Sequence, residues 1–215
     1  MKGVYFTLGV LTGAFLALPG VAADPVKIGF ITTLSGPAGY LGEDARDGFQ
    51  LAIDLEGGKL GDTPIQLLVE DDQLKPATGK QLADKFIKSD KAKIISGIIF
   101  SNVAVAAVPS ILESGAFFIS SNAAPSEFAG QGCNKNYFVV SWQNDNLHES
   151  AGKAASDLGY KKMAILAPNY QAGKDALGRL GAEVPAREGR RGQQPLAGQS
   201  EQVHRPQAPR RSDPR

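Results

Sequence analysis

The sequence predicts an α/β fold: a doubly wound parallel sheet, followed by an incomplete second unit and a disordered C-terminal tail. Three observations lead to this prediction. Apolar strand patterns alternate with helical patterns from Val26 onward, with short connections between them. Two of the strands end in small hydroxyl and amide residues. The composition changes abruptly after Leu177.

The first 23 residues are predicted to be a secretory signal peptide. Lys2 is the only charged residue before Asp24, and an apolar run from 4 to 18 is followed by the small residues Val21, Ala22 and Ala23. A membrane-anchoring first helix is the alternative, although the run is short for a membrane span. Export would place the mature chain in an oxidising compartment. Its single cysteine, Cys133, has no partner for a disulfide within the chain.

The alternation of patterns gives the order of the elements. Strands are expected at 26–32, 65–70, 93–99, 116–120, 137–141 and 162–167. Helices are expected at 43–56, from Pro76 onward, at 103–112, at 145–158 and from within 169–177. The helix at 145–158 would turn Leu147, Ala151, Ala154 and Leu158 inward. The strand at 162–167 would begin the sheet of a second lobe.

Residues 94–127 carry the main indication of a binding site. Ser101 and Asn102 follow one predicted strand, and Ser120, Ser121 and Asn122 end the next. In an open parallel sheet, ligands bind outside the carboxyl ends of the strands, where helix-start N–H groups add positive partial charge. The stretch therefore predicts a small anionic or zwitterionic ligand. The alternative is that Ser101 and Asn102 only cap the next helix.

The last segment, 178–215, differs from the rest of the chain. Residues 24–177 contain 14 basic and 18 acidic residues, a net charge of −4, whereas 178–215 contain 8 arginines and 4 acids, a net charge of +4. Arg, Pro, Gly and Gln make up most of this segment, so it is predicted to be disordered. Either it is a basic tail that binds acidic surfaces, or it is translated out of frame from GC-rich DNA. The second interpretation is favoured because the helical pattern breaks off at Gly178.

Residues 24–177 resemble the amino-terminal part of a type I periplasmic solute-binding protein of the branched-chain amino-acid (Leu/Ile/Val-binding) receptor family of ABC transporters. The resemblance is carried, in order, by KIGFITTLSGPAGYLGEDARDGFQLAID, LLVEDDQLKPATGKQLADKFI, ISGIIFSNVAVAAVPSILESGAFFISSNAAPSE and AILAPNYQAGKDA. It implies a periplasmic protein of two α/β lobes that close on a ligand. Lobe 1 would span 24–141, and lobe 2 would begin at 142 and stop at 177.

The resemblance also implies which residues bind the ligand. Ser101 matches the serine that holds the ligand carboxylate, Asn122 and Ala124 match two positions that grip the carboxylate and ammonium, and Tyr170 matches a lobe-2 tyrosine that closes over the ligand. The predicted site residues are Ser101, Asn102, Asn122, Ala123, Ala124 and Tyr170. Because amino-acid binders of the family often have a hydroxyl where Ala124 lies, another small carboxylate, such as an aromatic acid, is also consistent.

Other chemistries lack support in the sequence. The histidines His148 and His204 are expected on the exposed side of a helix and in the tail, which excludes a histidine-based triad or metal site. The run 70–72 (EDD) is interpreted as a polar strand end feeding a loop. Trp142 is interpreted as hinge packing. A hydrolase would need a nucleophile and base pair that is not found, so no enzyme activity, cofactor or nucleic-acid partner is expected.

The predicted function follows from the resemblance. The intact parent would be a monomer that delivers an amino acid or a related small carboxylate to an ABC permease in the inner membrane. This chain would be a non-functional fragment of it. The alternative is an exported ligand-sensing or regulatory domain of the same fold.

Overall fold

The computed structural model describes residues 24–183, so the predicted signal peptide and residues 184–215 of the predicted tail lie outside the described residues. The strands are β1 (Val26–Thr32), β2 (Lys59–Leu60), β3 (Thr63–Asp71), β4 (Ile94–Gly97), β5 (Phe117–Ser120) and β6 (Tyr137–Val139). The helices are α1 (Tyr40–Leu55), α2 (Pro76–Lys88), α3 (Ser101–Glu113), α4 (Asn144–Asp157) and α5 (Gln171–Glu183), with the 3₁₀ turns η1 (Ser126–Phe128) and η2 (Gly130–Gly132). No helix within 24–183 has the length and apolarity needed to cross a membrane.

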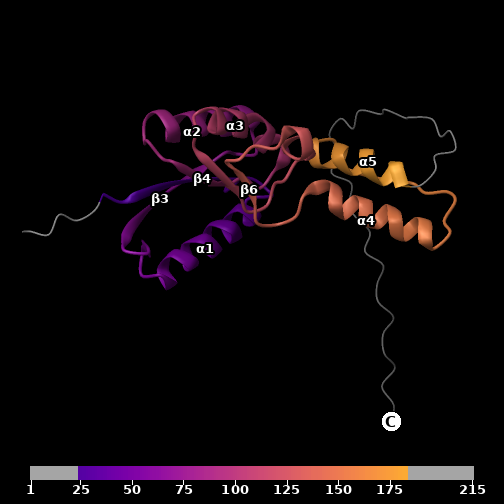
Figure 1. Cartoon of the computed structure of the whole chain (residues 1–215), viewed down its shortest axis with the longest axis horizontal. Coiled ribbons are helices and arrows are strands. Elements are labelled where there is room, and N and C mark those ends of the chain that lie inside the picture. Colours follow the sequence, from indigo (N-terminus) through magenta and orange to yellow (C-terminus); the bar gives the residue numbers. More distant parts are fainter. Residues whose placement is uncertain (1–23, 184–215) are drawn as a thin grey trace, which may run out of the picture.

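The strands form one sheet in the order β2-β3-β1-β4-β5-β6. All neighbours from β3 to β6 are parallel, and only the short β2, which was not predicted, pairs antiparallel with β3. Helix α1 lies on one face of the sheet, and α2 and α3 lie on the other (Figure 1). The predicted doubly wound parallel sheet is therefore confirmed. The strand order reverses between β1 and β4, which is the position where such sheets bind ligands.

The core lies between the sheet and helices α2 and α3. Phe86 of α2 is fully buried, and it packs over β1 at Gly29, where an added Cβ would lie 2.5 Å from the phenylalanine ring. Helix α3 contributes an almost wholly apolar buried face, as its composition predicts. The fully buried residues of this core include Ile31, Ala83, Phe86, Ile95, Ile98, Val103, Ala104, Ala107, Val108, Ile111 and Phe118.

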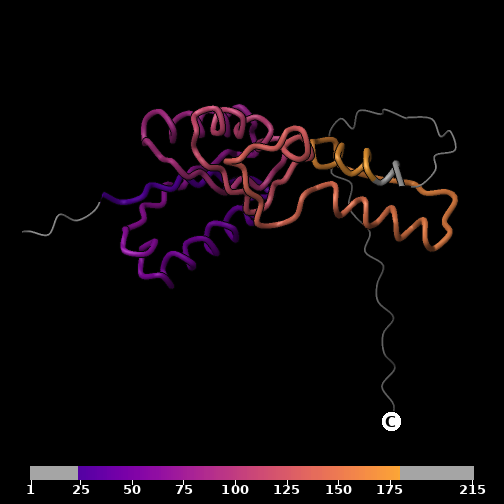
Figure 2. Tube along the Cα trace, in the orientation of Figure 1, coloured from indigo at the N-terminus to yellow at the C-terminus, as the bar shows by residue number. Residues whose placement is uncertain are grey.

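The predicted strand at 162–167 is wrong. These residues form neither helix nor strand, and Leu166 is 96% exposed. A strand is held by hydrogen bonds to neighbouring strands, and the six strands within 24–183 pair in one sheet that this segment does not join. The segment instead connects α4 to α5, which lie side by side beyond the end of the sheet (Figures 1 and 2).

The predicted inner face of helix α4 is also wrong. Leu147 and Leu158, predicted to turn inward, are 51% and 71% exposed, and Ala151 and Ala154 are exposed as well. The buried residues are Asn144, Asp145, Gly152 and Ala155. The apolar stripe suits packing on a sheet, but here α4 packs against α5 and the loops of the single sheet. Its small and polar face is therefore the one that is covered.

Helix α5 corrects the predicted start of the disordered tail. The helix continues from Gln171 to Glu183 and so runs through Gly178, where the sequence pattern was interpreted as breaking off. The first six residues of the predicted tail, 178–183, are thus helical. One of them, Arg179, makes ion pairs with α4.

Candidate functional site

The candidate site lies at the carboxyl ends of β4 and β5. The chain leaves β4 through Gly97, with φ of +93°, and Ile98, with φ of +60°. A positive φ is strained for a β-branched residue such as isoleucine, and such strain clusters at functional sites. This turn is fixed by backbone hydrogen bonds from the Ile98 N–H to the Ile31 carbonyl and from the Ala123 N–H to the Ile98 carbonyl. The turn positions the start of α3 at Ser101.

A cavity of about 150 Å³ lies at these strand ends. It is formed by the residues following β4 and β5 together with the first turns of α4 and α5. Its lining residues are Ile99, Ser101, Asn122, Ala123, Trp142, Asn144, Leu147, His148, Tyr170 and Ala172. Four of the six predicted site residues, Ser101, Asn122, Ala123 and Tyr170, are thus brought together although they lie up to 69 positions apart in the sequence.

The other two predicted residues, Asn102 and Ala124, do not line this cavity. Asn102 lies in the first turn of α3, and its side-chain oxygen is buried without a hydrogen-bond partner. Ala124 is 1% exposed, and its backbone carbonyl accepts a hydrogen bond from the Asn144 N–H at 3.0 Å. Ala124 therefore contributes to the site by fixing the start of α4.

A larger and more open recess of about 330 Å³ lies between α2 and α3. Its lining includes Lys80, Asp84, Lys88 and Glu113, which are surface residues of the two helices. Lys80 and Lys88 form i,i+4 ion pairs with Asp84. This recess lies away from the strand ends, so we assign the candidate site to the smaller cavity.

The polar residues of the cavity include Ser101, Asn122 and Asn144. Ser101 is 3% exposed, and its hydroxyl oxygen accepts a hydrogen bond from the side-chain amide of Asn144 at 3.2 Å. The Asn122 amide donates to the Ile99 carbonyl at 2.7 Å, which ties the two strand-end loops together. Ser101 also begins α3, where the first N–H groups of the helix lack intrahelical acceptors. A hydroxyl beside a helix N-terminus is an arrangement suited to binding an anion.

The remaining lining is mainly apolar and aromatic. Tyr170 packs edge-on against Phe100, with ring centroids 6.1 Å apart, and burial raises the pKa of its phenol. Trp142 and Leu147 line the cavity while remaining about half exposed. The interpretation of Trp142 as hinge packing did not anticipate this position. His148, expected on the exposed side of α4, is half-buried and lines the cavity as well.

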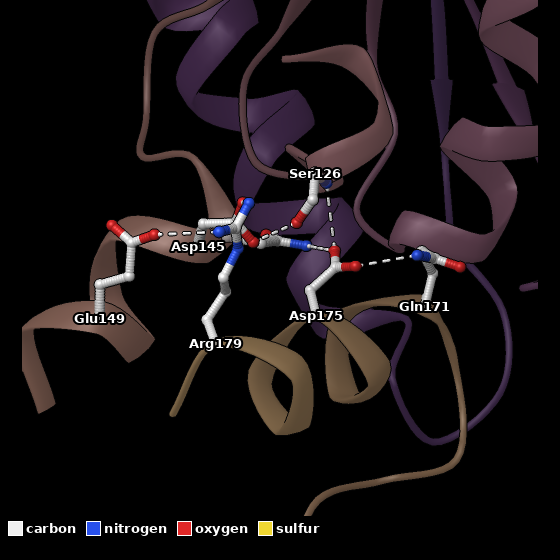
Figure 3. Close-up of polar contacts among 7 residues, drawn as sticks. Ser126, Asp145, Glu149, Gln171, Asp175 and Arg179 are labelled. Atoms are coloured by element: carbon white, nitrogen blue, oxygen red, sulfur yellow. Dashed lines mark hydrogen bonds and ion pairs between the residues drawn. The ribbon is translucent and has the colours of Figure 1, made fainter. Parts of the chain in front are cut away.

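A polar network joins α5 to α4 and to the segment after β5, as Figure 3 shows. Asp175 is 8% exposed, and one of its carboxylate oxygens accepts hydrogen bonds from the Asn144 amide at 2.9 Å and the Ser126 N–H at 3.2 Å. Its other oxygen accepts one from the Gln171 amide at 2.8 Å. Because Asn144 also donates to Ser101, the network reaches the polar wall of the cavity.

The same network contains an ion pair one helical turn further along α5. Arg179 lies 3.0 Å from the carboxylate of Asp145 and 3.6 Å from that of Glu149. Although partial burial favours the neutral acid, the Ser126 hydroxyl and the Arg179 guanidinium hold the pKa of Asp145 below its usual range. Partial burial and the nearby Asp175 charge raise the pKa of Glu127. Arg179 therefore compensates two of the acidic groups gathered beside the site.

The acidic run at 70–72 has the structural role that the sequence predicted. The Thr33 hydroxyl donates to Asp72 at 2.6 Å, and the Leu34 N–H donates to Asp71 at 2.9 Å, so both carboxylates fix the loop after β1. Burial raises the pKa of Asp72, which is fully buried. Within 24–183, no group of three or more His, Cys, Asp or Glu residues is arranged to hold a metal ion.

The residues that sequence analysis missed are mainly Asn144, Asp175 and Arg179. One signal for two of them is visible in the sequence. Gln171, Asp175 and Arg179 recur at intervals of four and so form one polar stripe on a helix. Asn144 has no comparable signal, because its role depends on how α4 approaches the loop after β5.

Comparisons with known proteins agree with this geometry. The profile of a family described as "Periplasmic binding protein" matches residues 25–196. The chain is 28% identical over 167 residues to Leu/Ile/Val-binding protein homolog 6 of Brucella abortus (strain 2308), an alignment that covers 75% of this chain and 41% of that protein. The chain thus spans about two fifths of the length of this curated relative.

Solved structures show the same fold. A solute-binding protein of an ABC transporter from R. palustris, in complex with benzoate, is 30% identical with a TM-score of 0.70, covering 74% of this chain and 44% of that one. The branched-chain amino acid transporter substrate-binding protein LivJ from Streptococcus pneumoniae, in complex with isoleucine, is 20% identical with a TM-score of 0.66. That alignment covers 75% of this chain and 47% of the other.

Proposed function

Since the chain belongs to the periplasmic binding protein family, we propose that its cavity is part of the ligand site of an exported substrate-binding component of an ABC importer. The ligand would be a small carboxylate, either a branched-chain type amino acid or an aromatic acid. The observation that supports this most directly is the cavity at the ends of β4 and β5, where Ser101, Asn122, Ala123 and Tyr170 converge.

The chemistry of the cavity suits a small carboxylate. Ser101 offers a hydroxyl beside the N-terminus of α3, where positive partial charge favours an anion. Ile99, Trp142 and Tyr170 offer apolar and aromatic surface for the remainder of the ligand. The volume of about 150 Å³ is below the roughly 300 Å³ at which pockets for drug-sized ligands begin. A ligand of about ten non-hydrogen atoms is therefore the appropriate size.

Two ligand classes remain to be separated. No acidic side chain lines the cavity to hold an ammonium group, and Ala124 supplies no hydroxyl near it, which favours an aromatic acid. The related R. palustris protein binds benzoate and supports the same choice. The Leu/Ile/Val-binding protein homologues support an amino acid. We therefore keep both classes in the proposal.

We further propose that this chain by itself is not a transport receptor. A receptor that closes on its ligand needs contacts from two lobes, and the relatives are more than twice as long as the part that aligns here. The permease partner would then belong to an intact parent protein. An exported sensor domain of the same fold is the second candidate. Permease and ATPase genes next to this gene would favour the importer.

The test is a titration followed by NMR, since weak binding is expected. Benzoate, leucine, valine and phenylalanine would be added to the purified protein, and we expect shifts at the cavity residues with a Kd of about 1 mM or weaker. Ser101→Ala should weaken binding at least fivefold, because it removes the hydroxyl donor. Ser110→Ala is the matched control, because the Ser110 hydroxyl lies on the same helix and bonds only to the Ala107 carbonyl. Equal binding by both variants would show that Ser101 is not part of the site. Micromolar binding by the unmodified chain would contradict the proposal that this chain by itself is not a transport receptor.

A further inference from the structure

We propose that Asp175 is a built-in competitor for the ligand carboxylate, held against the polar wall of the cavity by helix α5. The inference rests on the proposed function, because it assumes that a carboxylate binds near Ser101. Asp175 would lower the affinity of this site for anions. This is the role that we assign to the network that joins α5 to the strand ends (Figure 3).

The Asp175 carboxylate lies where two hydrogen-bond donors meet. A single oxygen receives hydrogen bonds from the Asn144 amide and the Ser126 N–H, which come from α4 and from the loop after β5. Two donors from separate parts of the chain thus converge on one buried anion. Such convergence is the arrangement expected for recognition of a carboxylate.

Asp175 shares one of these donors, the Asn144 amide, with the cavity. The Asn144 side-chain amide donates to Asp175 and to the Ser101 hydroxyl oxygen. A ligand carboxylate at Ser101 would draw on the same amide, while the Asp175 charge would lie one side chain away. Like charges in a poorly solvated site repel, so the two carboxylates cannot both be held well. None of the ion pairs among the described residues involves Asp175, so no ion-paired cation within 24–183 offsets this repulsion.

Helix α5 is held in place by contacts on both sides of Asp175. Arg179 pairs with Asp145, whose side chain is 7% exposed, and with Glu149 at the surface of α4. Tyr170 packs on Phe100 just before the helix begins. These contacts lie on either side of Asp175 along the chain and fix its carboxylate at the donors.

The test compares benzoate with its neutral analogue benzamide in NMR titrations of the purified protein. In Asp175→Ala, we expect benzoate to bind at least tenfold more tightly than in the unmodified protein, with little change for benzamide. A purely structural effect of the substitution would change both ligands alike. Asp157→Ala is the matched control, because Asp157 is an exposed aspartate of α4 that pairs with Lys153, and it should leave both affinities unchanged.

Asp175→Asn is the second variant, and it decides the matter if Asp175→Ala does not fold, because it removes the charge and keeps the size of the side chain. It should tighten benzoate binding about threefold or more. Benzoate should also speed hydrogen exchange of the α5 amides in the unmodified protein, because ligand and Asp175 exclude each other. Equal benzoate affinity in the unmodified protein and both variants, or slower exchange of α5 with benzoate, would overturn the inference and leave the proposed function standing. Absence of binding by every variant would overturn both.

Discussion

At the scale of single residues, the site depends on the turn that ends β4. Gly97 has φ of +93°, and a Cβ added there would lie 2.2 Å from the backbone carbonyl oxygen of Ile31. The neighbouring backbone of β1 cannot move aside without breaking the sheet. Glycine is therefore required at this position both for conformation and for space.

We predict that Gly97→Ala destabilises the protein by roughly 3 kcal/mol or more, since it combines an unfavourable φ with a backbone clash. Gly48→Ala is the matched control: Gly48 lies in α1, and an added Cβ would meet nothing within 4 Å. That substitution should stabilise the protein by about 0.5–1 kcal/mol. Urea unfolding of the two variants measures both effects. A cost below about 1 kcal/mol for Gly97→Ala would show that the turn relaxes.

The residues of the site differ in how far the sequence predicts them. Ser101 and Asn122 follow buried parallel strands, so the strand order alone brings them to one edge of the sheet. Tyr170 came from the resemblance to a family and lines the same cavity. Asn144 and Asp175 could not be predicted in this way, because their contacts depend on how α4 and α5 approach the sheet. That approach is a tertiary property, and no local pattern encodes it.

At the scale of elements, the packing of α2 on β1 holds the sheet and the helix layer together. Phe86 is fully buried against Gly29 and Ile95. Gly29 provides the space that the ring fills. The packing of α2 on β1 thus depends on a large residue, Phe86, that faces a small one, Gly29.

We predict that Phe86→Ala lowers the free energy of unfolding by about 3–5 kcal/mol, because it leaves a cavity at the centre of the core. Phe117→Ala is the comparison: Phe117 begins β5, is 43% exposed and should cost roughly 1 kcal/mol. Thermal or urea unfolding of both variants tests the difference. Similar costs for the two substitutions would place the main core elsewhere.

The elements that sequence analysis predicted wrongly share a physical reason. The pattern of 162–167 (KMAILA) and the apolar stripe of α4 are both typical of elements that pack on a sheet. In this chain the sheet that they would complete is absent from residues 24–183, so the segment stays unpaired and α4 turns its apolar stripe outward. Local patterns specify which surfaces can be buried, whereas burial itself requires a partner.

At the scale of the whole molecule, the described chain has two unequal parts. The sheet with α1, α2 and α3 contains nearly all of the fully buried side chains, whereas the pair α4 and α5 adds only a few buried residues, among them Ala155, Asp175 and Ala176. Figure 2 shows the pair projecting from the end of the sheet. Regions with few buried apolar contacts open at low free-energy cost, so the pair should open well before the sheet does.

Limited proteolysis with trypsin should detect this division. Lys161 and Lys162 are exposed in the connection between α4 and α5, which forms neither helix nor strand and exposes most of its side chains. Lys80 and Lys88 are comparably exposed but lie within α2, so they serve as internal controls. Among the described residues, we expect cleavage after Lys161 and Lys162 at least tenfold faster than after Lys80 and Lys88, measured by peptide mapping of early digestion products. A protease must bind an extended segment of backbone, which the connection offers and a packed helix offers only after opening. Equal rates at the four lysines would mean that α2 opens as readily as the connection, and the sheet could then no longer be regarded as the stable part of the molecule.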